Sequence, residues 1–529
     1  MYERRTWCWA AMVFVVVAIG CGGGSKHPAD APPGDGPPVD SPHDAVVDSP
    51  ADAALDAPAG SADEITDFKF LAANNAGLAA DAHATILSSA TGTDVSVAVP
   101  YGTAVTALVA TFTTTGTKVS VGPTVQTSGV TANNFSSTVT YTVTAVDGST
   151  RDYAVTVTTT DFVSGGVFAT GNSSRYSAVG DFNADGKPDL AVPNLASSTV
   201  SVLLDTTASG ATTATFAPKL DLAAASGPIA AAIADLDGDG KPDLAVTNYN
   251  ANTVSVFINT TATGATTPSF ANRIDLTTGT GPFAIAIVDI NGDGKRDLVV
   301  TDTGTQATPD NKMSVLLNMT TAAGTPTFAA KSDFTVAMIP TSVTSADFNG
   351  DGKPDLAFGF YQLAQVSILL NTTATGVSVP TFATQVDLAQ QGYSFWVTSG
   401  DLDGDGRPDL AATTEDQAIW TYVNTTATGA AAASFGTPVF YRTRYYSFHL
   451  AIGNVDSDPR PDIVVVGDGD GVQLLGNRTS SMSALTLLPP FDFPVQPQPY
   501  ASAIADFNGD SKPDLAITDT GGVEIMLAR

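Results

Sequence analysis

The chain has 529 residues, of which 43% are hydrophobic and only 14% are charged, a balance typical of folded, turn-rich proteins and not of disordered ones. The formal net charge is −30, and a field of that sign repels phosphate backbones, which argues against nucleic-acid binding and favours cations as partners. The two cysteines, Cys8 and Cys21, lie near the start, so the rest of the chain has no disulfide framework.

Residues 1–20 have the pattern of a signal peptide. Two arginines precede an apolar run, residues 10–19, that is too short to span a bilayer stably. The junction AIGC that follows resembles the lipobox of bacterial lipoproteins, although it begins with Ala where Leu is commoner. The resemblance implies that Cys21 is the lipidated first residue of the mature chain. Ordinary secretion with cleavage near Gly20 is the alternative.

Residues 21–63 are rich in Pro, Ala, Asp and Gly and contain few apolar residues to bury. Such a segment is expected to be an extended, solvated tether. With a lipid on Cys21, the tether would hold the folded part away from the membrane. We therefore expect an exported protein that is lipid-anchored to the cell envelope and displayed from the outer membrane at the cell surface.

Residues 64–160 alternate short Val/Thr/Phe runs with turns, which predicts a β-sandwich. The expected strands are 65–71, 94–99, 108–112, 138–146 and 153–158. The last two flank Asp147-Gly148 and predict a hairpin. The closing pattern YTVTAVDGSTRDYAVTV resembles bacterial immunoglobulin-like domains of surface proteins. This implies an Ig-like spacer, with a small adhesion module as the alternative.

Residues 161–529 contain an internal repeat, which is most evident in the stretch DLDGDGKPDL that begins at Asp235. Seven copies of this acidic loop begin at spacings of 54, 54, 58, 54, 53 and 52 residues. Each copy lies among four short apolar runs, as in 230–234, 243–247, 253–259 and 270–276, and four strands per repeat predict a seven-bladed β-propeller.

The two ends of the repeat region also fit a closed ring. The last repeat ends after its third strand, 523–527, and its missing fourth strand is available at 162–169. Pairing these two segments would remove exposed sheet edges. An open solenoid of the same repeats is the structural alternative.

The acidic loop has the spacing Asp-x-Asp/Asn-x-Asp-Gly-x-x-Asp, which predicts an oxygen cage of the kind that calcium prefers over magnesium. Oxygens at positions 1, 3, 5 and 9 supply the side-chain ligands, a backbone carbonyl at position 7 joins them, and Gly at position 6 permits the sharp turn. The expected ligands in chain order are Asp181, Asn183, Asp185 and Asp189; Asp235, Asp237, Asp239 and Asp243; Asp289, Asn291, Asp293 and Asp297; Asp347, Asn349, Asp351 and Asp355; Asp401, Asp403, Asp405 and Asp409; Asp456, Asp458 and Asp462; and Asp506, Asn508, Asp510 and Asp514.

Two loops depart from this pattern. The sixth has Asn454 at position 1 and Pro459 at position 6, and Pro is unable to adopt a positive φ. The seventh has Ser511 at position 6. We expect up to seven Ca²⁺ sites, of which the sixth and seventh are the weakest. A single such loop without metal would be an Asx-rich turn, but seven copies in register favour a cation role.

These repeats resemble the FG-GAP and VCBS families, the calcium-loop propellers also seen in integrin α-subunits. The resemblance covers roughly 370 residues. It implies seven blades, calcium in the loops between first and second strands, and a role in adhesion or ligand binding. It names no ligand, so an unidentified glycan or protein is expected.

The candidate ligand face is the one built by loops between second and third strands and between blades. It would carry Tyr249, Tyr361, Tyr393, Tyr445 and Tyr446. Aromatic rings with polar edges suit sugar or peptide contacts, although packing between blades is an equally good interpretation. A further set at one repeat position is predicted to be core: Phe283, Phe395, Phe448 and Tyr500.

No catalytic motif is evident, because outside the tether only His83 and His449 are present and no Ser/His/Asp or zinc spacing occurs. The sequence therefore predicts a calcium-binding adhesion or binding module and no enzyme. The alternatives are a calcium-dependent polysaccharide lyase or hydrolase on a propeller, and a purely structural envelope protein.

Overall fold

The computed structural model describes residues 63–528 with the exception of 76–77, 79–80, 90–91, 101–102, 161, 306, 456–459, 468–470, 480–484 and 489. The predicted signal peptide, Cys21 and nearly all of the tether lie outside the described residues. The described chain is all-β, with two single-turn 3-10 helices at Ala72–Asn74 and Val105–Ala107. Over this range, no helix has the length and apolarity that a membrane crossing requires.

The N-terminal β domain contains nine strands in the order β6-β5-β8-β9-β3-β2-β1-β4-β7. Their bounds are β1 Ile65–Phe70, β2 Ala82–Ser89, β3 Gly92–Pro100, β4 Leu108–Thr114, β5 Lys118–Val121, β6 Thr124–Val125, β7 Ala132–Asn133, β8 Val139–Thr144 and β9 Thr150–Thr160. The pair β3 and β9 is parallel and the other pairs are antiparallel. Strands β2, β5, β6 and β7 were not predicted from the sequence.

This nine-stranded ladder folds back on itself to form two layers. The ring of Phe68 on β1 lies 5.3 Å from that of Tyr141 on β8, and Phe112 on β4 lies 5.9 Å from Tyr141. Three strands separate β1 from β8 in the sheet order, so these contacts must pass across a shared interior. The predicted hairpin is confirmed, since β8 and β9 pair antiparallel around Gly148, whose φ is 85°.

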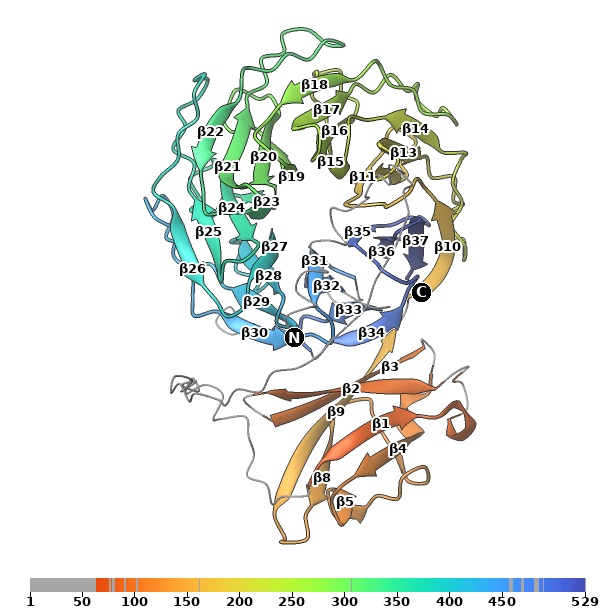
Figure 1. Ribbon diagram of the computed structural model, residues 1–529. Coiled ribbons are helices and arrows are strands. Elements are labelled where there is room, and N and C mark those ends of the chain that lie inside the picture. Colours follow the sequence, from red (N-terminus) through yellow and green to blue (C-terminus); the bar gives the residue numbers. More distant parts are fainter. Residues whose placement is uncertain are drawn as a thin grey trace, which may run out of the picture. The chain divides into compact units, whose positions relative to one another are not determined.

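The rest of the chain forms seven four-stranded sheets arranged in a ring (Figure 1), so the predicted seven-bladed propeller is confirmed. Blades 1 to 4 consist of β11 Ala178–Gly180, β12 Asp189–Asn194, β13 Thr199–Leu203, β14 Leu220–Ala223; β15 Pro228–Ala234, β16 Asp243–Asn248, β17 Thr253–Phe257, β18 Ile274–Thr277; β19 Pro282–Val288, β20 Asp297–Gly304, β21 Pro309–Leu316, β22 Ser332–Thr335; and β23 Pro340–Ala346, β24 Asp355–Phe360, β25 Gln365–Leu369, β26 Val386–Ala389. Blades 5 to 7 consist of β27 Ser394–Gly400, β28 Asp409–Thr414, β29 Ala418–Tyr422, β30 Val439–Arg442; β31 Ser447–Gly453, β32 Asp462–Gly467, β33 Gly471–Leu475, β34 Phe491–Pro494; and β35 Ala501–Ala505, β36 Asp514–Thr518, β37 Gly522–Leu527 with β10 Val163–Ala169.

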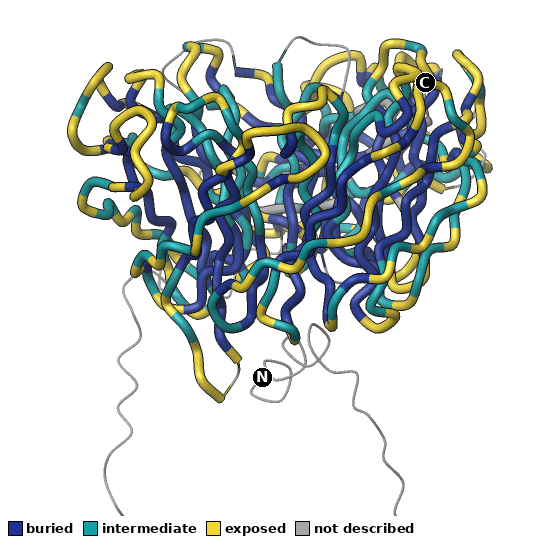
Figure 2. Tube along the Cα trace, turned by 90° about the horizontal axis from the view of Figure 1, so that it is seen from above, coloured by how far each residue is buried: buried dark blue, intermediate teal, exposed yellow. Residues whose placement is uncertain are grey.

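Burial along each blade follows from its residue pattern. The second strands begin with an aspartate and continue with an apolar run, and they are buried along their whole length because adjacent blades cover both of their faces. The outermost strands of blades 1 to 4 alternate half-buried and exposed residues. In Figure 2 the buried residues accordingly follow the strands, and the exposed residues gather in the connecting loops.

The fourth strand is shorter than predicted. In blade 2 it begins at Ile274, whereas Phe270 forms only an isolated bridge with Asn259. Residues 262–268, between Asn259 and Phe270, form a turn whose Gly264 contacts the neighbouring blade, as described below.

The ring closes through the ends of the domain, as predicted. Strand β10 pairs antiparallel with β37, in a register that joins Val163 to Leu527 and Ala169 to Gly522. Blade 7 thus combines the first strand of the domain with the last three, so that each of the seven blades has four strands. The open-solenoid alternative is wrong.

Aromatic side chains pack together along the innermost strands. The ring of Phe395 lies 6.1 Å from Phe283 and 6.3 Å from Phe448, which agrees with their predicted core position. Tyr176, from the connection that enters blade 1, stacks on Trp396 of blade 5 at 4.6 Å. Rings from blades 1, 3, 5 and 6 therefore meet near the axis, and the centre of the propeller is packed at this level.

Candidate functional site

The acidic loops connect the first and second strands of each blade and curl around their own side chains. In blade 2 the carboxylate of Asp235 accepts hydrogen bonds from the backbone N–H groups of Gly238 and Gly240, at 2.7 and 2.9 Å. The N–H of Asp239 donates to Asp237 at 3.0 Å, and that of Lys241 donates to Asp239 at 2.8 Å. This curl turns the side chains at positions 1, 3 and 5 toward one point.

Positions 1, 3 and 5 come together as the sequence predicted. Carboxylate oxygens of Asp235, Asp237 and Asp239 lie within 4.8 Å of one another, and so do those of Asp401, Asp403 and Asp405. The loops with Asn at position 3 curl in the same way, since the position-5 N–H donates to both the position-1 and the position-3 side chain. These bonds join Asp185 to Asp181 and Asn183, Asp293 to Asp289 and Asn291, Asp351 to Asp347 and Asn349, and Asp510 to Asp506 and Asn508.

The position-9 aspartates are buried and act as clamps between the loop and the sheet. One oxygen accepts the N–H of loop position 2 at 2.8–3.0 Å. The other accepts an N–H at the end of the third strand at 2.6–2.8 Å. All seven have no exposed surface: Asp189, Asp243, Asp297, Asp355, Asp409, Asp462 and Asp514. They are not part of the three-carboxylate clusters found in blades 2 and 5.

Burial makes the charged form of these clamps costly. It raises the pKa of Asp189, Asp243 and Asp409 to about 7, despite the backbone hydrogen bonds that favour the carboxylate. It raises the pKa of Asp297, Asp355 and Asp514 to about 6. Repulsion by the nearby acids at positions 1, 3 or 5 adds to the effect, so a bound cation would favour ionisation of the whole loop.

The loops fit a calcium ion by the chemistry of their donors. The side chain of Asp403 is almost fully buried, and its Oδ2 has no hydrogen-bond partner among the described residues. Burial and the neighbouring Asp405 raise its pKa. A buried acceptor in a cluster of oxygens is an unfavourable arrangement without a cation and a favourable one with it.

The two irregular loops differ in what they retain. In the sixth, Asp456, Asp458 and Pro459 lie outside the described residues, but Asp462 forms both clamp bonds. In the seventh, Ser511 adopts the positive φ of 69° that Gly has elsewhere, and its N–H donates to Asp506 at 2.8 Å. The seventh loop thus keeps the shared curl at a cost in backbone strain.

Five of the loops also contact the next blade through their third position. The position-3 carbonyl accepts the N–H of a glycine in the turn before the fourth strand of that blade, as between Asn183 and Gly264 at 2.7 Å. Blades 3 and 4 repeat this contact, and blade 7 makes it to Gly210 of blade 1. In blade 2 the Asp237 carboxylate accepts the N–H of Gly324. An ion held by a loop would therefore stiffen a seam between blades.

A buried asparagine at the end of the third strand forms a second link between blades. Its amide donates to the position-2 carbonyl of the preceding loop at 2.7–2.9 Å and accepts the N–H two residues on. The five are Asn259, Asn318, Asn371, Asn424 and Asn477. All five stand in an Asn-x-Thr sequence, and the bond to the N–H two residues on is the turn chemistry of that sequence. Sequence spacing does not show which distant carbonyl an amide meets, so the link to the neighbouring blade was not predicted.

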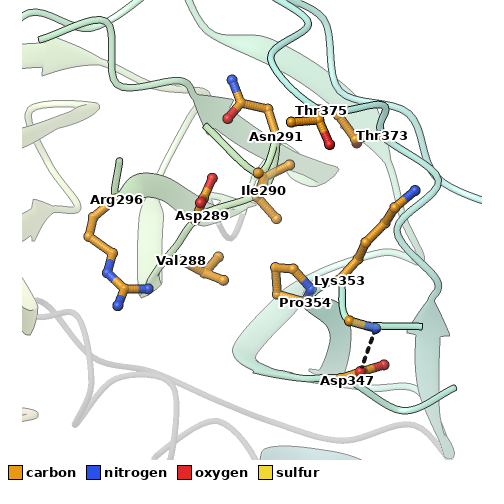
Figure 3. A pocket seen from close by; sticks show the side chains of 12 residues that line it. Val288, Asp289, Ile290, Asn291, Arg296, Asp347, Lys353, Pro354, Thr373 and Thr375 are labelled. Carbon is orange, nitrogen blue, oxygen red and sulfur yellow. Dashed lines mark hydrogen bonds between the residues drawn. The ribbon is translucent and has the colours of Figure 1, made fainter. Parts of the chain in front are cut away.

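Grooves lie at the seams beside the loops. One of about 350 Å³ lies between blades 3 and 4, and Figure 3 shows Asp289, Arg296 and Lys353 around it. One of about 570 Å³ has the same place between blades 7 and 1. Because the groove recurs, its lining belongs to the repeat and not to one specialised centre. Arg296 is the exception, since the other six loops have Pro at this position.

The five candidate tyrosines do not form one open patch. Tyr249 is buried, and its hydroxyl donates to the carbonyl of Gly304 in the next blade at 2.9 Å. Tyr361 is half-buried against Phe395, and Tyr393 and Tyr445 are also half-buried. Only Tyr446 is exposed, at 45%. Packing between blades thus describes Tyr249, and the ligand role of the other four tyrosines stays a prediction.

Comparison with family models finds FG-GAP repeats in the propeller. Residues 181–246, 235–300 and 454–517 match the FG-GAP-like repeat, and residues 340–369 match the FG-GAP repeat. Residues 76–157, in the N-terminal β domain, match the model described as "SGBP, N-terminal", from surface glycan-binding proteins. Together these matches suggest a surface glycan-binding module and point to binding rather than catalysis.

Comparison with whole proteins adds little. No curated protein matches the chain. Two solved structures titled as BBS1N in complex with ARL6DN, soaked with mercury or with lead, are 11% and 10% identical to it. Each alignment covers 70% of this chain and 97% or 98% of the solved chain, with TM-scores of 0.44 and 0.46.

Proposed function

We propose that this protein is a cell-surface glycan-binding module whose propeller is stapled by calcium. The observation that carries the proposal is the combination, in one chain, of a surface-glycan-binding domain match at 76–157 with FG-GAP loops, two of which gather three acidic side chains. Export and lipid anchoring through Cys21, on the tether 21–63, belong to the same proposal. Adhesion would follow from display of the glycan-binding surface.

The metal part of the proposal assigns a role to each loop position. Positions 1, 3 and 5 would hold the ion, as Asp401, Asp403 and Asp405 do in blade 5. Calcium would supply positive charge to a cluster of oxygens that otherwise repel. A loop fixed by the ion would in turn hold the third strand through the position-9 clamp and the next blade through the position-3 contact. The N-terminal β domain, for which an Ig-like role as spacer was expected, would take part in glycan binding.

The glycan-binding part is tested with the exported, full-length protein on immobilised glycans and soluble polysaccharides, with calcium and with EDTA. We expect binding to at least one glycan class in calcium and weaker binding after chelation, because the propeller loses the ions that stabilise its loops. Absence of binding to every glycan, with calcium-loaded protein that unfolds cooperatively, would refute the function. Release of shortened products from the bound polysaccharide would instead support the lyase or hydrolase alternative.

A further inference from the structure

The outer rims of blades 1 to 4 share a polar side-chain pair. A serine on the third strand faces an aspartate on the fourth, and the hydroxyl lies 2.6–3.2 Å from the carboxylate. The pairs are Ser201–Asp221, Ser255–Asp275, Ser314–Asp333 and Ser367–Asp387. In blades 1 to 3 a cation two residues before the aspartate forms an ion pair with it. Blade 6 uses Gln473 with Asp492 in the same register.

Blade 5 replaces this pair with two aromatic rings. The register that joins serine to aspartate elsewhere joins Trp420 on β29 to Phe440 on β30, the outermost strand of this blade (Figure 1). The two ring centroids are 5.5 Å apart and the planes are tilted by 39°. Phe440 is 44% exposed and Trp420 is half-buried. Pro438 stands where blades 1 to 3 have the cation.

A cationic side chain lies on the same face. Arg442 is two residues beyond Phe440, so the strand period places both side chains on one face, and Arg442 is exposed. The inner part of Trp420 packs against the core between blades 4 and 5, which includes Tyr422 and Leu388. Trp420, Phe440 and Arg442 form what we call the rim platform: a pair of aromatic rings, of which Trp420 packs against the core, and an arginine on the same face of β30 as Phe440.

The rim platform contributes less to folding than a buried pair would. The other rims show that Ser and Asp satisfy the fold at this register, whereas an exposed Phe keeps much of its apolar surface in water. Two aromatic side chains offer about 150–250 Å² each when fully covered. That is below the roughly 800 Å² per partner of a stable protein interface. It suits a ligand of one or two rings.

We propose that the rim platform is a polysaccharide-binding site, in which the aromatic rings stack on the apolar face of a pyranose and Arg442 donates hydrogen bonds to its substituents. The proposal rests on the glycan-binding function above and adds to it a place on the propeller, distinct from the matched N-terminal domain. Substituents that accept from Arg442 can be hydroxyl groups of a neutral chain or carboxylates of a uronate chain.

The test compares wild type with the double substitution W420S/F440D, which installs the pair that four other blades carry at this register. The matched control is V379S, which removes an exposed apolar side chain, 62% exposed, from a turn of blade 4. Affinity electrophoresis and calorimetry would use β-glucan, xylan and galactomannan as neutral probes, and polygalacturonate and alginate as acidic ones. Thermal unfolding is measured for each protein.

We expect W420S/F440D to bind the recognised polysaccharide at least tenfold more weakly while it still unfolds cooperatively, at a lower temperature because the core contacts of Trp420 are lost. V379S should bind as wild type does. R442Q should weaken binding to acidic probes more than to neutral ones if the carboxylate is the acceptor. Wild-type binding that survives W420S/F440D would overturn the rim platform while leaving the glycan-binding function in place. Lack of binding by wild type itself would overturn that function and the platform with it.

Discussion

Asp205, at the end of the third strand of blade 1, stands where five other blades have the asparagine that links neighbouring blades. Its Oδ1 accepts the N–H of Thr207 at 2.7 Å, but its Oδ2 is buried with no hydrogen-bond partner among the described residues. In five other blades the equivalent amide nitrogen donates to the position-2 carbonyl of the preceding loop. By the same register, an amide at residue 205 would meet the carbonyl of Phe507 and join blade 1 to blade 7.

The substitution Asp205→Asn should therefore stabilise the propeller. A new hydrogen bond contributes about 0.5–1.5 kcal/mol, and leaving a buried polar atom unsatisfied costs about 1–3 kcal/mol. We expect the free energy of unfolding to rise by about 1–3 kcal/mol at pH 7.5, measured by urea unfolding in calcium. The reverse change Asn371→Asp is the matched control and should lower it by a similar amount.

The gain should depend on pH. Burial raises the pKa of Asp205, with Asp185 acting in the same direction and Lys187 against it. A raised folded-state pKa means that the stabilising, protonated form is present at low pH and is lost as pH rises. The free energy of unfolding of the wild type should therefore approach that of Asp205→Asn as pH falls from 7.5 to 5. If Asn371→Asp is destabilised but Asp205→Asn is no more stable than wild type at pH 7.5, the register argument is wrong at this seam.

Two further predictions concern the loops. Ser511→Gly should stabilise the protein by about 0.5–1 kcal/mol, because Ser511 has a φ of 69° and only Gly adopts it without strain; a lower melting temperature would contradict this. In EDTA, thermal stability should fall as pH rises from 5 to 8, because the pKa values of the clamps, about 6 to 7, lie above those of free aspartate; calcium should flatten this slope, and a rise with pH in EDTA would contradict the assignment.

The repeat architecture could be predicted because its signals are local and multiplied. Seven acidic loops fixed the number of blades, and the lone apolar run at 162–169 fixed how the ring closes. The β3–β9 parallel pair was beyond prediction, since no local pattern records which distant strand lies alongside. The fourth strand was drawn too long because Phe270 looks like a strand residue, although it forms only a bridge to Asn259.

The candidate site divides in the same way. Spacing alone predicted that positions 1, 3 and 5 come together. It also predicts position 9 as a ligand, which stays a prediction; the structure adds that Asp243 accepts two backbone N–H groups and has no exposed surface. Tyr249 looked like a surface residue because its burial depends on the next blade. The Trp420–Phe440 pair was detectable in principle, by aligning VFYR with the outer strands LDLA and IDLT.

Calcium-dependent unfolding tests the central claim most directly. Calorimetry would follow the calcium-loaded full-length protein with and without EDTA, beside a variant with Asp401, Asp403 and Asp405 changed to Asn. With a Kd of ~10⁻⁴ M and ~10⁻³ M calcium, each occupied site adds about 1.4 kcal/mol to the free energy of unfolding. We predict a large drop in melting temperature on chelation for wild type and a smaller drop for the variant. Identical melting curves with and without calcium would contradict the account.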